Sequence, residues 1–177
     1  MSILQPLSDL EKWHAEPDPW KYEVHPHDQR RVQMLLSEIP DRKYARVLDV
    51  GCGQGFVTAK LPGASVIGLD VSENAIQFAK KLETDRLKFQ VGGIFELPEL
   101  FSEPFDLVII TGVLYPQYIA SAKTLVYRAI DKILAPGGIL VSVHIDEWYS
   151  SRFPYFLAKT ISYPYREYFH RLEIYEK

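Results

Sequence analysis

The chain has 177 residues, of which 24% are charged, with a formal net charge of -3 and a single cysteine, Cys52. This length suits one domain with a substantial core and leaves little sequence for a second. The acidic balance argues against nucleic acid as a partner, because nucleic-acid-binding domains usually carry a basic surplus. One cysteine excludes an intrachain disulfide and suits a reducing compartment, so we expect a cytoplasmic protein.

The sequence also disfavours membrane and metal chemistry. Its apolar runs all fall short of the roughly 18 residues that a membrane-spanning helix needs. The first six residues lack the basic and apolar regions of a secretory signal. His25 and His27 lie on a proline-rich segment without a third partner at metal-ligand spacing. We therefore expect no membrane segment and no bound metal.

Residues 1–44 are predicted to form an N-terminal segment and helix ahead of the core. The first 28 residues are rich in aromatic side chains, and prolines at 17, 19 and 26 argue against a continuous helix. Aromatic rings in such a segment either anchor it to the core or close over a ligand, and Trp20 and Tyr22 are the candidates. Residues 29–38 show helical spacing of apolar side chains, and Pro40 ends this helix.

The stretch 45–56 begins with a short apolar run that includes Val47 and Val50. Glycines follow it at alternate positions: Gly51, Gly53 and Gly55. An apolar run of this length that stops at glycine predicts a buried parallel strand. Residues 56–61 then show helical spacing until Pro62. A strand, a glycine turn and a helix together bring free backbone N–H groups up to a ligand.

A second predicted strand, residues 65–70, ends in the carboxylate of Asp70, 19 residues after Gly51. At this spacing an acidic residue accepts hydrogen bonds from both hydroxyls of a ribose. The glycine turn and Asp70 together indicate a cofactor that contains adenosine. Ser72 is a good N-cap for the next helix, and residues 87–91 alternate as a third strand.

Two further strands, residues 105–111 and 139–145, are nearly all apolar. The first leads into a loop with Tyr115, which faces either substrate or core, at the end where open α/β sheets bind ligands. The second closes with His144, near Asp146. A histidine near a carboxylate is either a general base or a structural residue at a strand end. Between these strands a helix is predicted to turn one apolar face inward: Leu125, Val126, Ala129, Ile130 and Ile133.

The C-terminal arm is aromatic and basic over residues 149–166, where Pro154 and Pro164 break any long helix. Alternation over residues 168–175 predicts a last strand. Because only about 30 residues follow the fifth strand, the final hairpin must be compact.

Four motifs in chain order resemble those of the class I S-adenosylmethionine-dependent methyltransferases. They are Val47-Leu-Asp-Val-Gly-Cys-Gly-Gln-Gly55, Val66-Ile-Gly-Leu-Asp-Val-Ser72, Phe105-Asp-Leu-Val-Ile-Ile110 and Leu134-Ala-Pro-Gly-Gly-Ile-Leu-Val141. The resemblance covers residues 45–145. In addition, Asp18-Pro-Trp-Lys-Tyr22 followed by Arg30-Arg31 resembles the N-terminal segment of the NodS-like N-methyltransferases.

The resemblance implies an α/β fold with a Rossmann-like, doubly wound, mostly parallel sheet and an antiparallel last strand, in a single domain. Residues 45–177 are expected to form this core with a short C-terminal substrate arm. The implied cofactor is S-adenosylmethionine, with the N-terminal segment as a lid and Arg30 or Arg31 on its carboxylate. Many members have an aspartate where Gly93 stands, so adenine recognition falls to Ile94. The expected cofactor-binding residues are Trp20, Arg30, Asp49, Gly51, Cys52, Gly53, Gly55, Asp70, Val71, Gly93, Ile94 and Thr111.

The expected function is methyl transfer to an N or O atom of a small molecule, with His144 and Tyr115 as catalytic candidates. Members of this family that methylate DNA, protein glutamine or a carbon atom of RNA carry additional sequence motifs. Those motifs are absent here, so the resemblance favours a small acceptor. A nicotinamide-dependent oxidoreductase is the alternative, although Phe56 stands where its fingerprint needs glycine or alanine. A third alternative is a non-catalytic cofactor-binding subunit of a larger assembly.

Overall fold

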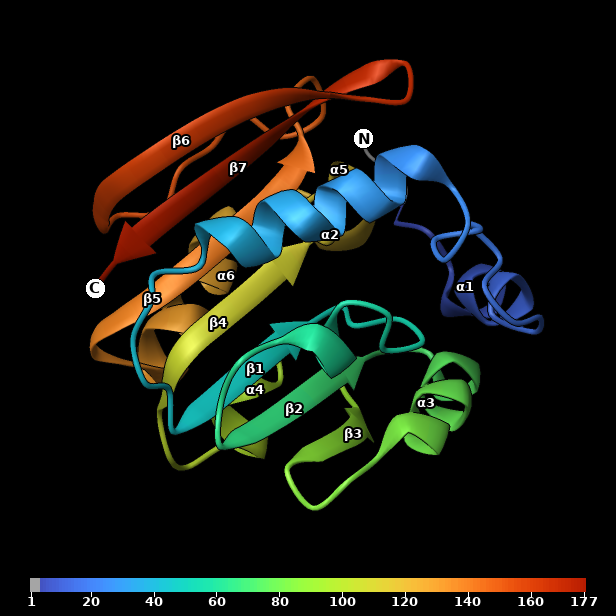
Figure 1. Ribbon diagram of the computed structural model, residues 1–177, viewed down its shortest axis with the longest axis horizontal. Coiled ribbons are helices and arrows are strands. Elements are labelled where there is room, and N and C mark those ends of the chain that lie inside the picture. The colour runs from blue at the N-terminus through green and yellow to red at the C-terminus, as the bar shows by residue number, and fades with distance from the viewer. Residues whose placement is uncertain (1–3) are drawn as a thin grey trace.

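Seven strands form one sheet in the order β3-β2-β1-β4-β5-β7-β6 in the computed structural model, which describes residues 4–177 (Figure 1). The strands are β1 (Arg46–Val50), β2 (Ser65–Asp70), β3 (Leu87–Val91), β4 (Phe105–Thr111), β5 (Leu134–Ile145), β6 (Phe156–Tyr165) and β7 (Tyr168–Glu176). The first five run parallel, whereas β7 is antiparallel to both β5 and β6. The predicted fold class, with its antiparallel final strand, is confirmed.

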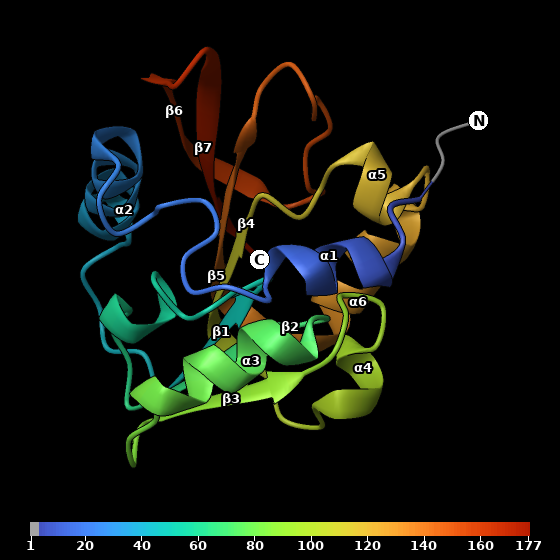
Figure 2. The same cartoon turned by 90° about the vertical axis from the view of Figure 1, so that its right-hand side faces the viewer.

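Helices cover both faces of this sheet (Figure 2). They are α1 (Leu7–Trp13), α2 (Pro26–Glu38), α3 (Glu73–Ala79), α4 (Leu97–Leu100), α5 (Pro116–Ile119) and α6 (Lys123–Ile133), with short 3-10 turns η1 (Thr58–Lys60) and η2 (Lys80–Leu82). Apolar side chains of α2 and α3 pack on one face, and those of α4 and α6 on the other. None of the helices within residues 4–177 has the length and apolar character that crossing a bilayer requires.

Strand β4 shows how the two faces are filled. Its successive side chains point to opposite faces, as the pleat of a strand requires. Leu107 and Ile109 belong to the core under α2, whereas Val108 and Ile110 belong to the core under α6. All four are at most 1% exposed, which explains why this strand is apolar throughout.

The helix predicted for residues 56–61 is wrong. The structure has only the 3-10 turn η1 at this point. Val57 and Thr58 are β-branched, which lowers helix propensity, and Pro62 prevents the segment from lengthening. Thr58 is used differently: its hydroxyl donates a 2.7 Å hydrogen bond to the Asp49 carboxylate at the end of β1. The short turn therefore supports the first strand rather than covering the sheet.

The predicted apolar face of α6 is correct except at one position. Val126, Ala129, Ile130 and Ile133 are buried, but Leu125 is 55% exposed. The four buried residues follow the spacing i, i+3, i+4, i+7 of a single helix face. Leu125 stands one position earlier and is therefore rotated about 100° away from the sheet.

The C-terminal arm is the compact hairpin β6–β7, and the alternating stretch 168–175 falls within β7. Strand β6 lies outermost in the sheet, and Pro164 stands near its end. The division into a segment 1–44 and a core 45–177 stays a prediction, and its first three residues lie outside the described residues.

Candidate functional site

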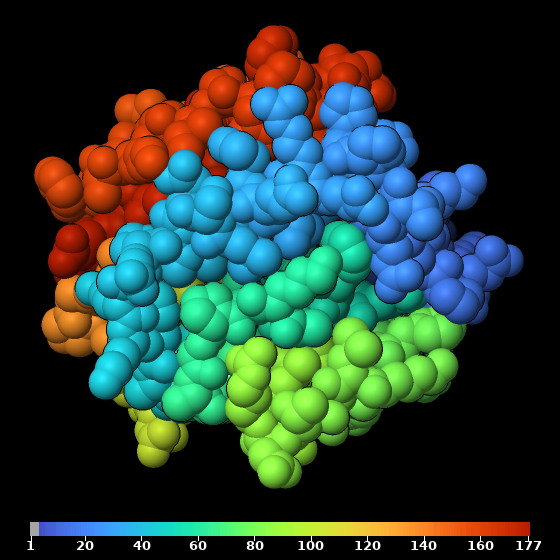
Figure 3. All heavy atoms as spheres, viewed as in Figure 1, coloured from blue at the N-terminus to red at the C-terminus, as the bar shows by residue number. Residues whose placement is uncertain are grey.

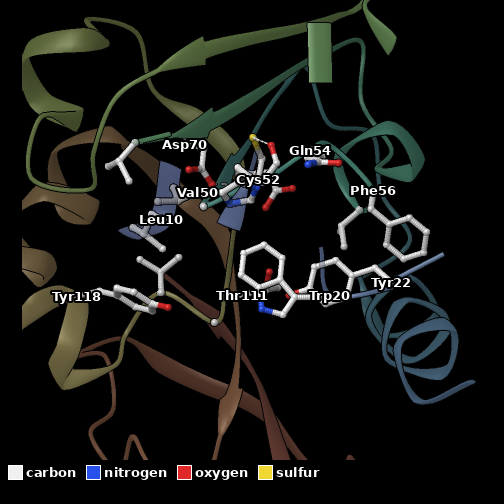
Figure 4. Close-up of a pocket in the computed structure, with 18 of the residues that line it drawn as sticks. Leu10, Trp20, Tyr22, Val50, Cys52, Gln54, Phe56, Asp70, Thr111 and Tyr118 are labelled. Carbon is white, nitrogen blue, oxygen red and sulfur yellow. Dashed lines mark hydrogen bonds between the residues drawn. The ribbon is translucent and has the colours of Figure 1, made fainter. Parts of the chain in front are cut away.

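A cavity of about 860 Å³ opens at the carboxyl ends of the parallel strands. The strand order reverses between β1 and β4, and ligands of open α/β sheets bind in the crevice at such a reversal. Its volume lies in the range of roughly 300–1,000 Å³ that is typical of small-molecule pockets. In Figure 4, Asp70 and Cys52 lie along one wall of this cavity, and Thr111 and Tyr118 lie along another.

Most of the predicted site residues meet at this cavity. Those that line it are Trp20, Asp49, Gly51, Cys52, Gly53, Asp70, Val71, Gly93, Ile94, Thr111 and Tyr115. Arg30, Gly55 and His144 are not among the residues that line it. The contacts of the first group with a cofactor remain predictions, but their convergence on one space agrees with the spacing argument.

The glycine turn brings the backbone close to the cavity, with Gly51 at φ +76° and Gly53 at φ +53°. The expectation of free N–H groups is wrong for most of the turn. Gly51 and Cys52 both donate to the Leu69 carbonyl, at 2.8 and 3.0 Å. Gly53 donates to Asp70 Oδ2 at 2.8 Å. The glycines therefore make room for a ligand rather than supplying a row of donors.

Gly55 serves packing instead of the cavity. It adopts φ +84°, and a Cβ atom there would lie 2.8 Å from the Phe89 ring. Phe89 is buried in the core under α2 and α3. A residue in the left-handed region with no space for a side chain has to be glycine, so the third glycine of the motif follows from core packing.

Asp70 ends β2 with its carboxylate fixed from two sides. Oδ2 accepts from the Gly53 N–H and Oδ1 accepts from the Ser72 N–H at 3.0 Å. Burial raises the pKa of Asp70, while these two hydrogen bonds act in the opposite direction. Because each carboxylate oxygen can accept two hydrogen bonds, this carboxylate can still receive a hydroxyl pair from a ligand.

The end of β3 supplies Gly93 and Ile94, which are both part of the cavity wall. The Gly93 N–H donates to Glu96 Oε2 at 2.7 Å, so this donor is already engaged. Ile94 is 6% exposed and belongs to the core under α4 and α6. The wall offers an apolar surface at this point, next to Val71.

Asp49 is a buried carboxylate on the cavity wall, with 1% of its surface exposed. Oδ2 accepts from Thr58, whereas Oδ1 has no hydrogen-bond partner within the described part of the chain. Burial raises the pKa of Asp49 to about 6, and the nearby Arg31 opposes this shift. A buried anionic oxygen without a partner costs free energy unless a ligand supplies a donor.

Replacing Asp49 with asparagine should stabilise the ligand-free protein at neutral pH. The folded-state pKa of about 6 lies above the ordinary value of 3.8, so the stability that protonation contributes is complete below about pH 4. It is lost as the pH rises through about 6. At about 1.4 kcal/mol per pKa unit, the gain in the variant at pH 7 is up to about 3 kcal/mol.

Urea unfolding of the wild type and Asp49→Asn between pH 4 and 7 measures this difference. The free energies of unfolding should diverge across that window and meet near its acidic end. Parallel pH profiles would show that the Asp49 carboxylate is not destabilised by burial.

Arg31, rather than Arg30, reaches the cavity. Arg31 is 8% exposed and lines the wall, whereas Arg30 is exposed and lies outside it. The Arg31 guanidinium lies 4.8 Å from the centre of the Tyr22 ring, and its Nε lies 3.5 Å from Asp28 Oδ1. Helix phase explains the choice, because Arg31 shares the buried face of α2 with Asp28 and Leu35.

The N-terminal segment carries a row of stacked rings beside the glycine turn. Ring centres are 5.9 Å apart for Trp13 and Trp20, 5.7 Å for Trp20 and Tyr22, and 6.2 Å for Tyr22 and Phe56. Trp20 and Tyr22 line the cavity. In Figure 3 the N-terminal segment (blue) fills the surface between the C-terminal hairpin (red) and the green segment that includes α3.

Two sets of hydrogen bonds, which the sequence did not reveal, fix the N-terminal segment to the core. Gln54 accepts from the Asp18 N–H at 2.8 Å and donates to the Glu16 carbonyl at 2.9 Å. Glu11 of α1 accepts from Ser72 Oγ and from the N–H groups of residues 73 and 74 at the start of α3. The carboxylate thus binds the N-terminus of α3, where N–H groups lack helical partners.

Replacing Glu11 with alanine should loosen α1 over the cavity. Its carboxylate hydrogen bonds contribute about 1 kcal/mol in total at this half-buried position, so roughly five-fold faster limited proteolysis of residues 7–23 is expected. Asp9→Ala is the matched control, because the Asp9 carboxylate pairs only with Lys12 on the same helix among the ion pairs of the described chain. Equal proteolysis of both variants would show that the Glu11 hydrogen bonds do not hold α1 in place.

His144 lies outside the cavity lining, so its position does not support the general-base alternative and agrees with a structural residue at a strand end. It is 1% exposed and points away from the cavity, since its neighbour Ile145 lines the wall. Its Nδ1 lies 3.1 Å from Ser142 Oγ, and Arg171 Nη2 lies 3.0 Å from Nε2. Burial and the Arg171 charge lower the pKa of His144 to about 3.

Tyr115 lines the cavity, although it is only 6% exposed. Its hydroxyl accepts a 2.9 Å hydrogen bond from the Ile145 N–H. Burial raises the pKa of Tyr115 to about 12. Its ring therefore shapes the wall, while its hydroxyl ties the loop after β4 to the end of β5.

A doubly wound sheet with a glycine turn, an acidic residue at the tip of β2 and a cavity at the strand reversal defines a Rossmann-like domain for a nucleoside-containing cofactor. A family model described as "Methyltransferase domain" matches residues 41–166. The chain belongs to this methyltransferase family.

Known relatives agree with this membership, and a solved structure agrees with the fold. Trans-aconitate 2-methyltransferase of Deinococcus radiodurans is 39% identical over 110 residues, which cover 60% of this chain and 40% of that protein. Nodulation protein S of Rhizobium tropici is 29% identical over 132 residues, covering 72% and 55%. The N-methyltransferase NodS of Bradyrhizobium japonicum, solved with S-adenosyl-L-homocysteine, superposes with a TM-score of 0.82 at 20% identity over 97% of each chain. The chain thus spans about half the length of these two curated relatives.

Proposed function

We propose that the chain binds S-adenosylmethionine and transfers its methyl group to an N or O atom of a small molecule. The observation that carries this proposal is one continuous cavity over the strand reversal. Its lining includes Asp70, Ile94, Asp49, Arg31 and Tyr115. A cofactor and an acceptor can therefore lie side by side within it.

The residues on the wall fit the groups of this cofactor. Asp70 offers acceptors to the ribose hydroxyls. Asp49 Oδ1 is a buried anionic oxygen without a partner, which suits the ammonium group of the methionine portion. Arg31 Nε lies in ion-pair range of Asp28 without a hydrogen bond to it, so its donors suit the carboxylate of that portion. The buried charges thus complement a zwitterion.

The relatives support methyl transfer as the chemistry. A protein named as a trans-aconitate methyltransferase matches this chain in sequence, and one named as an N-methyltransferase matches it in fold. They differ from one another in acceptor, so the choice between N and O is part of the proposal. The nicotinamide alternative is disfavoured by the methyltransferase family model.

When bound, the cofactor supplies an electrophilic methyl group on a sulfonium. The protein's role is then to orient the acceptor and to exclude water. The stacked rings of Trp20 and Tyr22 cover the cavity beside the glycine turn. Glu11 and Gln54 hold that cover in place. No fixed catalytic base is required if the acceptor arrives deprotonated.

Parallel calorimetric titrations with S-adenosylmethionine, S-adenosylhomocysteine and NADH test the proposal. Micromolar binding of the first two and none of the third is the expected result. Binding of NADH alone would overturn it in favour of an oxidoreductase. Tight binding of S-adenosylmethionine without turnover on any acceptor, together with a stable partner on pull-down, would favour a non-catalytic subunit.

A further inference from the structure

Four aromatic rings gather on the side of the cavity that lies away from Asp70. They are Tyr115 and Tyr118 after β4, Trp148 after β5, and Tyr168 at the start of β7. The ring centres are 5.2 Å apart for Tyr115 and Trp148, and 5.1 Å for Trp148 and Tyr168. These pairs meet at 76° and 64°. We name these four residues the aromatic wall.

The aromatic wall lies where an acceptor has to enter. Asp49 of β1 and Asp70 of β2, which are proposed for the cofactor, belong to one half of the sheet, while the aromatic wall follows β4 and β5 and begins β7 in the other half. Trp148 is 41% exposed, so this part of the cavity communicates with solvent. Tyr118 lies on the wall opposite Asp70 and Cys52 in Figure 4.

Rings at steep angles to one another are suited to a positively charged group. The face of an aromatic ring carries negative potential and attracts a cation, with tryptophan the strongest. Several rings can surround one cation, which is how quaternary ammonium groups are recognised in proteins. A carboxylate gains no such attraction from the same rings.

The charged side chains nearby point to the same preference. Arg166 and Arg31 line the cavity, but both lie against the buried carboxylate of Asp28. Glu167 also lines the cavity and forms no ion pair within residues 4–177 in this structure. Glu167, which precedes Tyr168 of the aromatic wall in the chain, therefore offers a carboxylate that can attract a cationic group.

Neither Tyr115 nor His170 is placed to act as a base for an alcohol or phenol on this side of the cavity. The Tyr115 hydroxyl is bound to the Ile145 N–H. His170 stacks on Tyr165 at 3.7 Å, and its Nδ1 lies 3.3 Å from the Tyr163 hydroxyl. Burial lowers the pKa of His170 to about 3. A neutral amine needs no such base, because its lone pair is available once its proton has passed to solvent.

We propose that the acceptor is the nitrogen of an amine, and that the aromatic wall stabilises the positive charge that this nitrogen gains. This inference rests on the proposed methyltransferase function. The amine lone pair forms the N–CH3 bond as the S–CH3 bond breaks, and that electron pair stays on sulfur. Positive charge passes from sulfur to nitrogen, and the new ammonium group then releases a proton to water.

Two isosteric probes separate charge from shape: choline, and its neutral analogue 3,3-dimethyl-1-butanol. Each is titrated into the protein with S-adenosylhomocysteine present, and binding is followed by tryptophan fluorescence. Choline should bind about tenfold more tightly than the neutral probe, as expected for a cation over several rings. Trp148→Leu should remove this preference and Trp148→Phe should keep most of it. Phe156→Leu, at a 72% exposed position on β6, is the matched control and should change nothing.

Equal binding of the two probes would overturn the amine assignment. So would the absence of binding of either probe at about 50 mM, or tighter binding of acetate than of choline. None of these results changes the outcome of the calorimetric titration with S-adenosylmethionine. Failure of the amine assignment is therefore distinguishable from failure of the methyltransferase function. If the protein preferred choline but did not bind S-adenosylmethionine, the proposed methyltransferase function would be contradicted instead.

Discussion

Replacing Asp28 with alanine should lower the free energy of unfolding by about 3–5 kcal/mol, the cost of breaking a buried ion pair from one side. Asp28 is 0% exposed and accepts from the Tyr165 hydroxyl at 2.7 Å and from Arg166 Nη2 at 2.8 Å. Its loss leaves Arg31 buried without an anionic partner. Because these contacts join α2 to the β6–β7 turn, the hairpin should also loosen.

Urea unfolding measures this change, provided that the dependence on urea concentration stays constant. Asp9→Ala is a suitable control, since its pair with Lys12 is 3.7 Å long and exposed. Such surface pairs contribute about 0–1 kcal/mol. If Asp28→Ala cost less than about 1 kcal/mol, Asp28 would not hold Arg31 and the hairpin together.

Replacing Asp70 with alanine should weaken the binding of S-adenosylmethionine by about 1.5–3 kcal/mol, or roughly 10- to 150-fold in Kd. The variant loses the expected acceptors for the ribose hydroxyls. It also frees the Gly53 N–H, which donates to Asp70 at 2.8 Å, so the glycine turn loses part of its support. Asp70→Asn keeps one acceptor oxygen and should fall between the wild type and the alanine variant.

Calorimetric titration with S-adenosylmethionine gives these affinities directly. Asp85→Ala serves as the control, because Asp85 is exposed in the turn before β3 and lies outside the cavity lining. An unchanged Kd for Asp70→Ala would show that the Asp70 carboxylate does not contribute to binding the cofactor.

The sequence predicted the parallel half of the sheet well, because each of those strands is buried and reads as an apolar run. Strand β4, with four successive residues at most 1% exposed, is the clearest case. The outer strand β6 was not predicted as a strand. Its burial alternates irregularly, and its pairing with β7 depends on tertiary context rather than on local pattern.

The glycine turn and Asp70 were predictable because their spacing is fixed by the chain between two adjacent strands. Other site residues depend on contacts between distant segments. Glu11 binds the start of α3, about 60 positions later, and no local pattern signals this. The choice of Arg31 over Arg30 was available from helix phase, since Arg31 precedes Leu35 by four residues on the buried face. The role of His144 depended on its face of β5, which proximity to Asp146 does not reveal.

The position of β6 has a consequence for the protein at high concentration. A strand with one unpaired side presents free N–H and C=O groups, onto which another chain can add a strand. Strand β6 counters this in two ways. Its register shifts between Leu157 and Lys159, and Pro164 lacks an N–H group. The outer side of the sheet is therefore a poor template for intermolecular pairing, which favours solubility.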